Sequence, residues 1–358
     1  MLRNKPRLLV VTTRSSISVE PLLRSLQRAG FALALVHGQA AGPTLGDPSI
    51  ALFPTRPAQF GRVVERVLQD WAPERVIPAD EPSFLHVRAI YREHGRGDRL
   101  GSAVARTIAR SFGDPAAHDQ VVSLAALRLF AREHGLPVPN AVAVSDEAML
   151  HVLLESVPLP VMLKDDGDWG GARAETVRSV AAGIAAYHRL IGARHVATWR
   201  KEPRRRSVFL QQHIDGVAAK RAVACRDGTV LTGVSVEPLN GPEPALVAKV
   251  LVHPAMESIA AFVVKTLNLS GIVGFDFVLE HGSRRASLIA VKPYATPVSH
   301  LMIAGDSGFP AALHAAFATD RDAPRAGDGV VTPFPRLAPR LLAAATRHPA
   351  YASGMRWR

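Results

Sequence analysis

Residues 271–301 constrain the fold of this chain more than any other segment, because their pattern of side chains predicts a β-hairpin. The segment GIVGFDFVLEHGSRRASLIAVKPYATPVSHL contains two apolar runs on either side of the polar turn HGSRR. Runs rich in Val, Ile, Leu and Phe that flank such a turn are typical of two antiparallel strands. Ala290 and Lys292 share one face of the second strand, and Asp276 lies on its partner. Because neighbouring strands lie about 4.8 Å apart and opposite charges attract, we predict a salt bridge between Asp276 and Lys292 in the absence of a bound nucleotide.

The first 112 residues predict a small doubly wound α/β domain. The apolar run RLLVVTT, a helical pattern at about 19–29 and the apolar run FALALVHG form a β-α-β unit, which continues with SIALFP, a helix at about 59–71 and ERVIPAD. A short, continuous apolar strand followed by an amphipathic helix is typical of a parallel sheet. The segment TTRSSIS follows the first strand, so the Gly-x-Gly-x-x-Gly fingerprint of dinucleotide-binding domains is absent there. The breakers in SFGDPAAHD predict the end of this domain.

The composition is that of an ordinary globular protein. The chain has 358 residues, of which 47% are hydrophobic and 21% charged, enough for two or three domains with substantial cores. Its formal charge of +12 comes mostly from arginine spread along the chain without an aromatic-rich basic repeat, so nucleic acid is not the expected partner. The single cysteine, Cys225, excludes an intramolecular disulfide framework. No apolar run approaches the length of a signal or membrane-spanning segment, so we expect a cytoplasmic protein without a membrane partner.

Four ordered segments between residues 111 and 301 carry a resemblance to a known family. They are GLPVP, LPVMLKDDGDWGG, VFLQQHIDG and the hairpin with GFDFVLEHG and SLIAVKP. Together they resemble the ATP-grasp superfamily, and among its members the stand-alone carbamoyl-phosphate-synthase-like ligases. The resemblance implies an α/β fold with α+β lobes, in which a Rossmann-like pre-ATP-grasp domain precedes a two-lobed ATP-grasp domain. The implied divisions are 1–112 for the first domain, 113–318 for the ATP-grasp domain with lobes at about 113–205 and about 206–318, and 319–358 for a Pro- and Gly-rich tail with a short helix.

The resemblance also implies which residues bind a nucleotide. Lys164 ends a buried strand and Gly170-Gly171 lets backbone N–H groups approach closely, so both suit phosphate oxygens. The amides and backbone of the VFLQQHIDG strand suit the edge of adenine, which needs a donor beside an acceptor. The implied nucleotide-binding residues are Lys164, Gly170, Gly171, Gln211, Gln212, His213, Ile214 and Lys220, and the candidate catalytic residue is Lys249.

The hairpin departs from the family pattern at the positions that should carry the chemistry. The Glu, Asn and Arg of the family correspond here to Ala290, Lys292 and Tyr294, and Leu124 stands where the family has a phosphate-binding lysine. Mg²⁺ demands near-octahedral oxygen ligation, whereas Ala290 offers no ligand and Lys292 is a cation. Asp276 is left as the metal-ligand candidate, so the sequence argues against Mg²⁺ bound in the family's manner.

Two functions follow from the resemblance, and the sequence leaves both open. One is an ATP-dependent carboxylate–amine ligase that acts through an acyl-phosphate, with ATP as cofactor and a small carboxylate and an amine as substrates. The other is a catalytically impaired homologue that binds a nucleotide or another anion and regulates or scaffolds a partner. The identity of the substrates, the turnover of ATP and the oligomeric state, including a homodimer, do not follow from the sequence.

Overall fold

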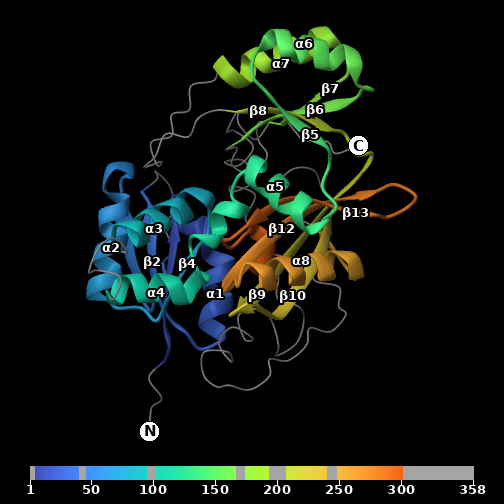
Figure 1. Cartoon of the computed structure of the whole chain (residues 1–358). Coiled ribbons are helices and arrows are strands. Elements are labelled where there is room, and N and C mark those ends of the chain that lie inside the picture. Colours follow the sequence, from blue (N-terminus) through green and yellow to red (C-terminus); the bar gives the residue numbers. More distant parts are fainter. Residues whose placement is uncertain are drawn as a thin grey trace.

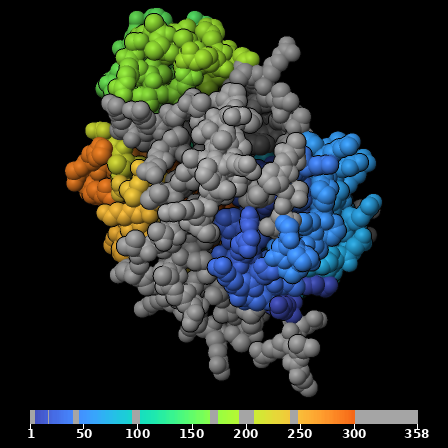
Figure 2. Space-filling view, turned by 180° about the vertical axis from the view of Figure 1, so that it is seen from behind, coloured from blue at the N-terminus to red at the C-terminus, as the bar shows by residue number. Residues whose placement is uncertain are grey.

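The computed structural model describes residues 5–39, 46–94, 102–166, 174–192, 207–239 and 248–300. Within them the strands form three sheets, called here the N-terminal sheet, the first-lobe sheet and the second-lobe sheet (Figure 1). In Figure 1 the first lobe lies at one end of the molecule, and the other two sheets lie side by side beneath it. The view from behind also shows the first lobe at one end (Figure 2). None of the helices in the described part of the chain has the length and hydropathy of a membrane span.

The N-terminal sheet is parallel and has the strand order β3-β2-β1-β4. Its elements are β1 (Arg7–Thr12), η1 (Ser16–Val19), α1 (Glu20–Arg28), β2 (Ala32–Gly38), β3 (Ala51–Thr55), η2 (Pro57–Gln59), α2 (Phe60–Asp70), β4 (Arg75–Pro78), α3 (Glu81–His94) and α4 (Ala103–Phe112). Leu8 and Val10 pack with α1, whereas Leu9 and Val11 pack with the other three helices. Burial on both faces explains why the strands are continuously apolar, as the sequence predicted.

The first-lobe sheet is antiparallel and has the order β5-β8-β6-β7. The elements of this lobe are β5 (Ala141–Val144), α6 (Glu147–Ser156), β6 (Val161–Asp165), β7 (Ala174–Val177), α7 (Val180–Gly192) and β8 (Val208–Gln212). Leu163 and Leu210 belong to the core cluster that α6 and α7 complete on one face. These two helices lie on the outer side of the sheet, so its opposite face turns toward the rest of the molecule (Figure 1).

The second-lobe sheet is antiparallel and has the order β11-β10-β9-β12-β13. The remaining elements are η4 (Ala117–Gln120), α5 (Leu124–His134), β9 (Gly216–Arg226), β10 (Thr229–Pro238), β11 (Ala248–Leu251), α8 (Pro254–Thr266), β12 (Gly271–Glu280), β13 (Ala286–Lys292) and η5 (Pro297–His300). Helices α5 and α8 cover one face, where Phe275 and Phe277 are buried. On the other face, Ala222 and Ile272 pack in one cluster with α1 of the N-terminal part. The second lobe and the N-terminal sheet therefore share a core.

The hairpin predicted at residues 271–301 is confirmed as β12 and β13. Asp276 pairs with Ala290 and Gly274 pairs with Lys292, so Ala290 and Lys292 share a face, as expected. The register shifts after Asp276, because Phe277 pairs with Leu288 and the pairing skips Ile289. This bulge lets Leu288 and Val291 both pack toward α8 while the charged residues keep to the opposite face.

Strand β8 and helix α5 each pack with a lobe other than the one expected from the sequence. Strand β8 falls after the expected division at about residue 205, but it pairs with β5 and β6 in the first-lobe sheet. Its apolar residues Val208 and Leu210 complete the core beneath α6 and α7, which holds the strand there. Helix α5 falls within the expected first lobe, but Leu127 and Phe130 pack with α8 in the core of the second lobe.

Candidate nucleotide-binding site

A cluster of two lysines and one aspartate lies on the face of the second-lobe sheet opposite α5 and α8. Asp276 on β12 pairs in register with Lys220 on β9 and with Ala290 on β13, and Lys292 follows on the same face. The Nζ atom of Lys292 lies 2.6 Å from Oδ2 of Asp276, and the Nζ atom of Lys220 lies 3.8 Å from Oδ1. The salt bridge predicted between Asp276 and Lys292 is therefore confirmed.

The three side chains of this cluster are largely withdrawn from solvent, which strengthens their mutual effects. Burial alone would raise the pKa of Asp276, but the charges of Lys292 and Lys220 outweigh it and lower that pKa. Burial would likewise lower the pKa of Lys292, but the carboxylate of Asp276 outweighs it and raises that pKa. At Lys220 burial prevails over the more distant Asp276 and lowers the pKa to about 8. Asp276 and Lys292 therefore form a stable ion pair at neutral pH.

The turn after β13 joins this cluster to the N-terminal sheet. The backbone N–H of Ala295 donates to the carbonyl of Pro78 at the end of β4, at 2.8 Å. Tyr294 packs against Phe84 of α3, with ring centroids 6.2 Å apart. Burial is the main cause that raises the pKa of Tyr294, although the charge of Lys292 opposes it. The phenol is therefore neutral at pH 7 and supplies no positive charge, as the sequence predicted.

Asp80 ties together the carboxyl ends of β1 and β4, the neighbouring strands at which the order of the parallel sheet reverses. Its Oδ2 atom accepts hydrogen bonds from Thr12 Oγ1 at 2.7 Å and from the Thr13 N–H at 2.7 Å. Its Oδ1 atom accepts from the N–H of Ser83 in α3 at 2.8 Å. Ligands often bind at such a reversal point in α/β sheets. Here the buried carboxylate is engaged by its own domain, so Asp80 has a structural role.

Lys164 approaches the same cluster from the first-lobe sheet. It follows Leu163 on β6, so it lies on the face opposite α6 and α7, and it is buried. Its positive charge is one of those that lower the pKa of Asp276, which places it near the second-lobe cluster. The structure therefore holds Lys220 within 4 Å of Asp276 on the second lobe, and it places Lys164 on the face of the first-lobe sheet that turns toward the rest of the molecule.

The neighbours of Lys164 on this face provide a mostly apolar surface. Met162 and Phe209 are buried there, and Gln211, also buried, pairs in register with Met162. This arrangement confirms the predicted alternation of β8, with Phe209 and Gln211 on one face and Val208 and Leu210 on the other. A buried amide beside apolar side chains is suited to a ring with a polar edge.

The residues after Gln211 form the connection from the first lobe to the second. The N–H of Gln212 donates to the carbonyl of Asn140 at 2.7 Å, and its side-chain Oε1 accepts from the Asn140 N–H at 3.4 Å. The side chain of Gln212 is exposed, whereas His213 and Ile214 are half-buried. Burial lowers the pKa of His213. Gln212 is thus used in part to hold β8 to the preceding loop.

The structure does not bring Lys249 to the cluster. Its neighbours Ala248 and Val250 on β11 pack toward α1, and Lys249 lies exposed on the opposite face, where it pairs in register with Glu237. Alternation along the strand therefore turns it away from the face that carries Lys220. This position does not support the catalytic role expected of Lys249. The phosphate-binding role expected of Gly170 and Gly171 falls on residues outside the described part of the chain.

Asp166 occupies a position that the sequence did not single out. Its Oδ1 atom accepts a hydrogen bond at 2.7 Å from the N–H of Leu124, the first residue of α5. A carboxylate is stabilised at a helix N-terminus, because backbone N–H groups there lack partners within the helix. The family pattern expects a lysine at Leu124, and here the backbone of that residue binds a carboxylate from the first lobe. The two adjacent aspartates after Lys164 were the signal in the sequence.

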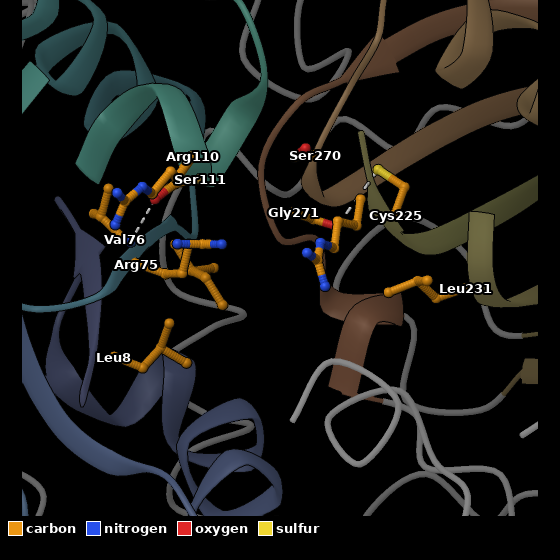
Figure 3. A pocket seen from close by; sticks show the side chains of 11 residues that line it. Leu8, Arg75, Val76, Arg110, Ser111, Cys225, Leu231, Ser270 and Gly271 are labelled. Carbon is orange, nitrogen blue, oxygen red and sulfur yellow. Dashed lines mark hydrogen bonds between the residues drawn. The ribbon is translucent and has the colours of Figure 1, made fainter. Parts of the chain in front are cut away.

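A small cavity lies away from this cluster, at the amino-terminal ends of β1 and β4. Figure 3 shows the side chains that line it. Leu8 and Arg75 line it from the starts of β1 and β4, and Cys225 and Gly271 line it from the second lobe. Its volume of about 20 Å³ is enough for about one water molecule. Burial lowers the pKa of Arg75 there, and the nearby charge of Arg110 adds to this effect. The cavity is too small for a nucleotide.

Ammonium groups face both oxygens of Asp276, the carboxylate that was expected as a metal ligand. Both oxygens of Asp276 lie within 4 Å of an ammonium group, at 2.6 and 3.8 Å, and its neighbour in register is Ala290. Among the described residues, no three His, Cys, Asp or Glu side chains are grouped so that they could hold a metal ion. Mg²⁺ requires several oxygen ligands, and a cation at its position repels it. The carboxylate of Asp276 and the ammonium group of Lys292 therefore form an ion pair.

Comparison with known proteins defines the fold of the chain. No protein-family model matches the sequence, and no curated protein matches it. Solved structures do match. The biotin carboxylase domain of 2-oxoglutarate carboxylase from Hydrogenobacter thermophilus, solved as a dimer with MgADP, ADP and bicarbonate, is similar with a TM-score of 0.65 and 12% identity over 92% of this chain and 72% of that chain.

Two further structures agree with this match. N5-carboxyaminoimidazole synthase from Aspergillus clavatus, in complex with ADP and 5-aminoimidazole ribonucleotide, has a TM-score of 0.61 and 13% identity over 86% of this chain and 75% of that chain. L-amino acid ligase from Bacillus licheniformis has a TM-score of 0.56 and 14% identity over 89% and 75%. At such identities the likeness shows the fold. The chain is structurally similar to ATP-grasp proteins, which confirms the predicted fold class.

Proposed function

We propose that this protein binds an adenine nucleotide between the first-lobe and second-lobe sheets. The observation that carries the proposal is the convergence of lysines from both lobes on Asp276. Lys292 and Lys220 lie at 2.6 and 3.8 Å from its carboxylate, and the charge of Lys164 acts on it from the other lobe. Phosphate groups are well matched to several ammonium groups.

The base of the nucleotide would lie against the inner face of the first-lobe sheet. Met162 and Phe209 offer buried apolar surface for a planar ring, and Gln211 offers both a donor and an acceptor. The backbone at His213 and Ile214 continues from β8 beside them. The base would then contact the first lobe and the phosphates would contact both lobes. The buried apolar surface and the amide of Gln211 support the adenine-binding role proposed for β8. The ADP held by two of the similar structures is consistent with it.

Isothermal titration calorimetry with ADP tests the proposal. We expect one nucleotide per chain and at least about tenfold weaker binding for Lys164→Ala, equivalent to about 1.4 kcal/mol. Lys265→Ala is the matched control, because Lys265 is exposed near the end of α8 on the other face of the second-lobe sheet. If ADP, ATP and AMP all fail to bind, or if Lys164→Ala binds like the control, the proposed site is refuted.

We further infer that this nucleotide site is built for binding more than for turnover. Asp276 is held by two lysines, Ala290 supplies no oxygen ligand, and the neutral Tyr294 supplies no charge to a transition state. This supports the catalytically impaired function, with a regulatory or scaffolding role. The variant Ala290→Glu with Lys292→Asn and Tyr294→Arg should bind Mg-ATP more tightly than the native chain, and gain slow hydrolysis.

A second candidate is a carboxylate–amine ligase acting through an acyl-phosphate. It is favoured by the similar structures, one of which is named a ligase and another a synthase. The test is ADP formation by the native chain with mixtures of small carboxylates and amines. Turnover at about 1 s⁻¹ or faster, abolished in the triple variant, would establish the ligase in place of the impaired protein. The substrates and a homodimer remain predictions.

A further inference from the structure

Two lysines of the second lobe share the carboxylate of Asp276. Lys164, Lys220 and Lys292 all act on this carboxylate, and the two second-lobe lysines lie within 4 Å of it. Among the described residues, Glu81 at the start of α3 is a further carboxylate that acts on Lys292. The nucleotide phosphates of the proposed function would therefore lie beside the ammonium groups of Lys220 and Lys292.

The same geometry leaves no favourable position for a divalent cation beside Asp276. The ammonium group of Lys292 is in contact with one carboxylate oxygen and that of Lys220 faces the other. A metal ion that bound Asp276 would have to displace Lys292, which is 8% exposed and lies 2.6 Å from this carboxylate. The ammonium group of Lys292 already neutralises this carboxylate.

Building on the proposed nucleotide function, we propose that this site binds nucleotide phosphates without a divalent metal ion, with the ammonium groups of Lys220 and Lys292 as the neutralising charges. The ligand class is a metal-free adenine nucleotide. A nucleotide chelated by Mg²⁺ carries less negative charge and brings a cation toward Lys292. Mg²⁺ therefore competes with the protein for the phosphates and weakens binding.

Calorimetric titration of ADP into the native chain, in EDTA and in saturating MgCl₂ at matched ionic strength, tests this inference. Matching the ionic strength matters, because salt screens charge interactions of any origin. We expect ADP to bind at least about tenfold more weakly with Mg²⁺. Equal or tighter binding with Mg²⁺ overturns the inference and leaves the proposed function intact. Absence of ADP binding under both conditions overturns the proposed function.

Two variants show whether Lys292 is responsible for this effect. Lys292→Asn removes the ammonium group and offers an oxygen beside Asp276, so we expect the weakening by Mg²⁺ to disappear or reverse. Lys292→Arg keeps the positive charge, so we expect the weakening by Mg²⁺ to persist. The second variant also serves as the fold-preserving comparison, and Lys265→Asn on α8 is the surface control. If Lys292→Asn retains the full effect while it still binds ADP, Lys292 does not replace the metal ion.

Discussion

Replacement of Asp276 by asparagine probes the ion cluster at the centre of the candidate site. The substitution keeps the shape of the side chain but removes the charge that Lys292 and Lys220 share, at 2.6 and 3.8 Å. Two ammonium groups of like charge then remain close together in a site withdrawn from solvent. We expect the folded state to be destabilised, because buried charges without a partner are costly.

The size of this effect follows from the distances. With an effective dielectric constant of about 20, Coulomb's law gives about 6 kcal/mol at 2.6 Å and about 4 kcal/mol at 3.8 Å. Desolvation of the ions offsets much of this attraction, and breaking a buried ion pair typically costs about 3–5 kcal/mol. Since the side chain of Asp276 is 26% exposed, we expect the lower end of this range, about 3 kcal/mol.

Urea denaturation followed by circular dichroism measures this loss as a change in the unfolding midpoint at constant slope. The double variant Asp276→Asn with Lys292→Met removes both charges of the closer pair. We expect it to recover at least about 1 kcal/mol relative to Asp276→Asn, because the pair is coupled. If Asp276→Asn costs less than about 1 kcal/mol, or if the double variant is no more stable than the single one, the buried ion cluster is not as described.

Two further predictions concern stability away from the site. Gly113→Ala should destabilise the fold by at least about 1 kcal/mol more than Gly135→Ala in urea denaturation. Both glycines have positive φ, at +80° and +65°, but a Cβ at Gly113 would lie 2.2 Å from the carbonyl oxygen of Asn268, whereas Gly135 faces open space. A smaller difference would contradict the close packing of Gly113, which follows α4, against Asn268, which lies between α8 and β12. His118 is fully buried, and burial lowers its pKa from 6.5 to about 4. The unfolded chain therefore binds this proton first, and stability should fall by about 3 kcal/mol as the pH drops from about 6.5 to about 4. His118→Gln should flatten that part of the stability profile, and an unchanged profile would contradict the assignment.

The sequence predicted those parts of the fold in which local pattern and long-range packing agree. The N-terminal strands are apolar on both faces and are covered on both faces, and the hairpin at 271–301 forms with the expected facing of Ala290 and Lys292. The salt bridge between Asp276 and Lys292 follows from their positions on the same face of two neighbouring strands. Opposite charges on adjacent strands require no further information to be placed together.

Other features depended on partners far away in the chain. Strand β8 belongs to the first lobe because Val208 and Leu210 pack in a core with α6 and α7. The sequence of its five residues alone does not indicate which sheet the strand joins. Lys249 lies on a strand of four residues whose facing is set by its register with β10. The contact of Asp166 with Leu124 spans 42 residues and joins two lobes. Such contacts cannot be read from local spacing.

The metal site shows where family resemblance and physical chemistry give different answers. The resemblance alone implies Mg²⁺ on the hairpin, whereas the residues in place form an ion pair of Lys292 with Asp276. The sequence already placed the charge of Lys292 beside Asp276, and the structure adds the distance of 2.6 Å between Nζ and Oδ2. The comparisons therefore establish the fold, and the chemistry of the site has to be argued from the residues themselves.

A crystal structure of the protein with ADP in the absence of divalent metal ions tests the central claim most directly. The account predicts the base on the inner face of the first-lobe sheet beside Phe209 and Gln211. It also predicts phosphate oxygens within hydrogen-bonding distance of the ammonium groups of Lys164 and of Lys220 or Lys292, with Asp276 still paired to Lys292. ADP bound elsewhere on the molecule would contradict the account. So would a second crystal, grown with Mg²⁺, in which ordered metal ions bridge Asp276 and the phosphates.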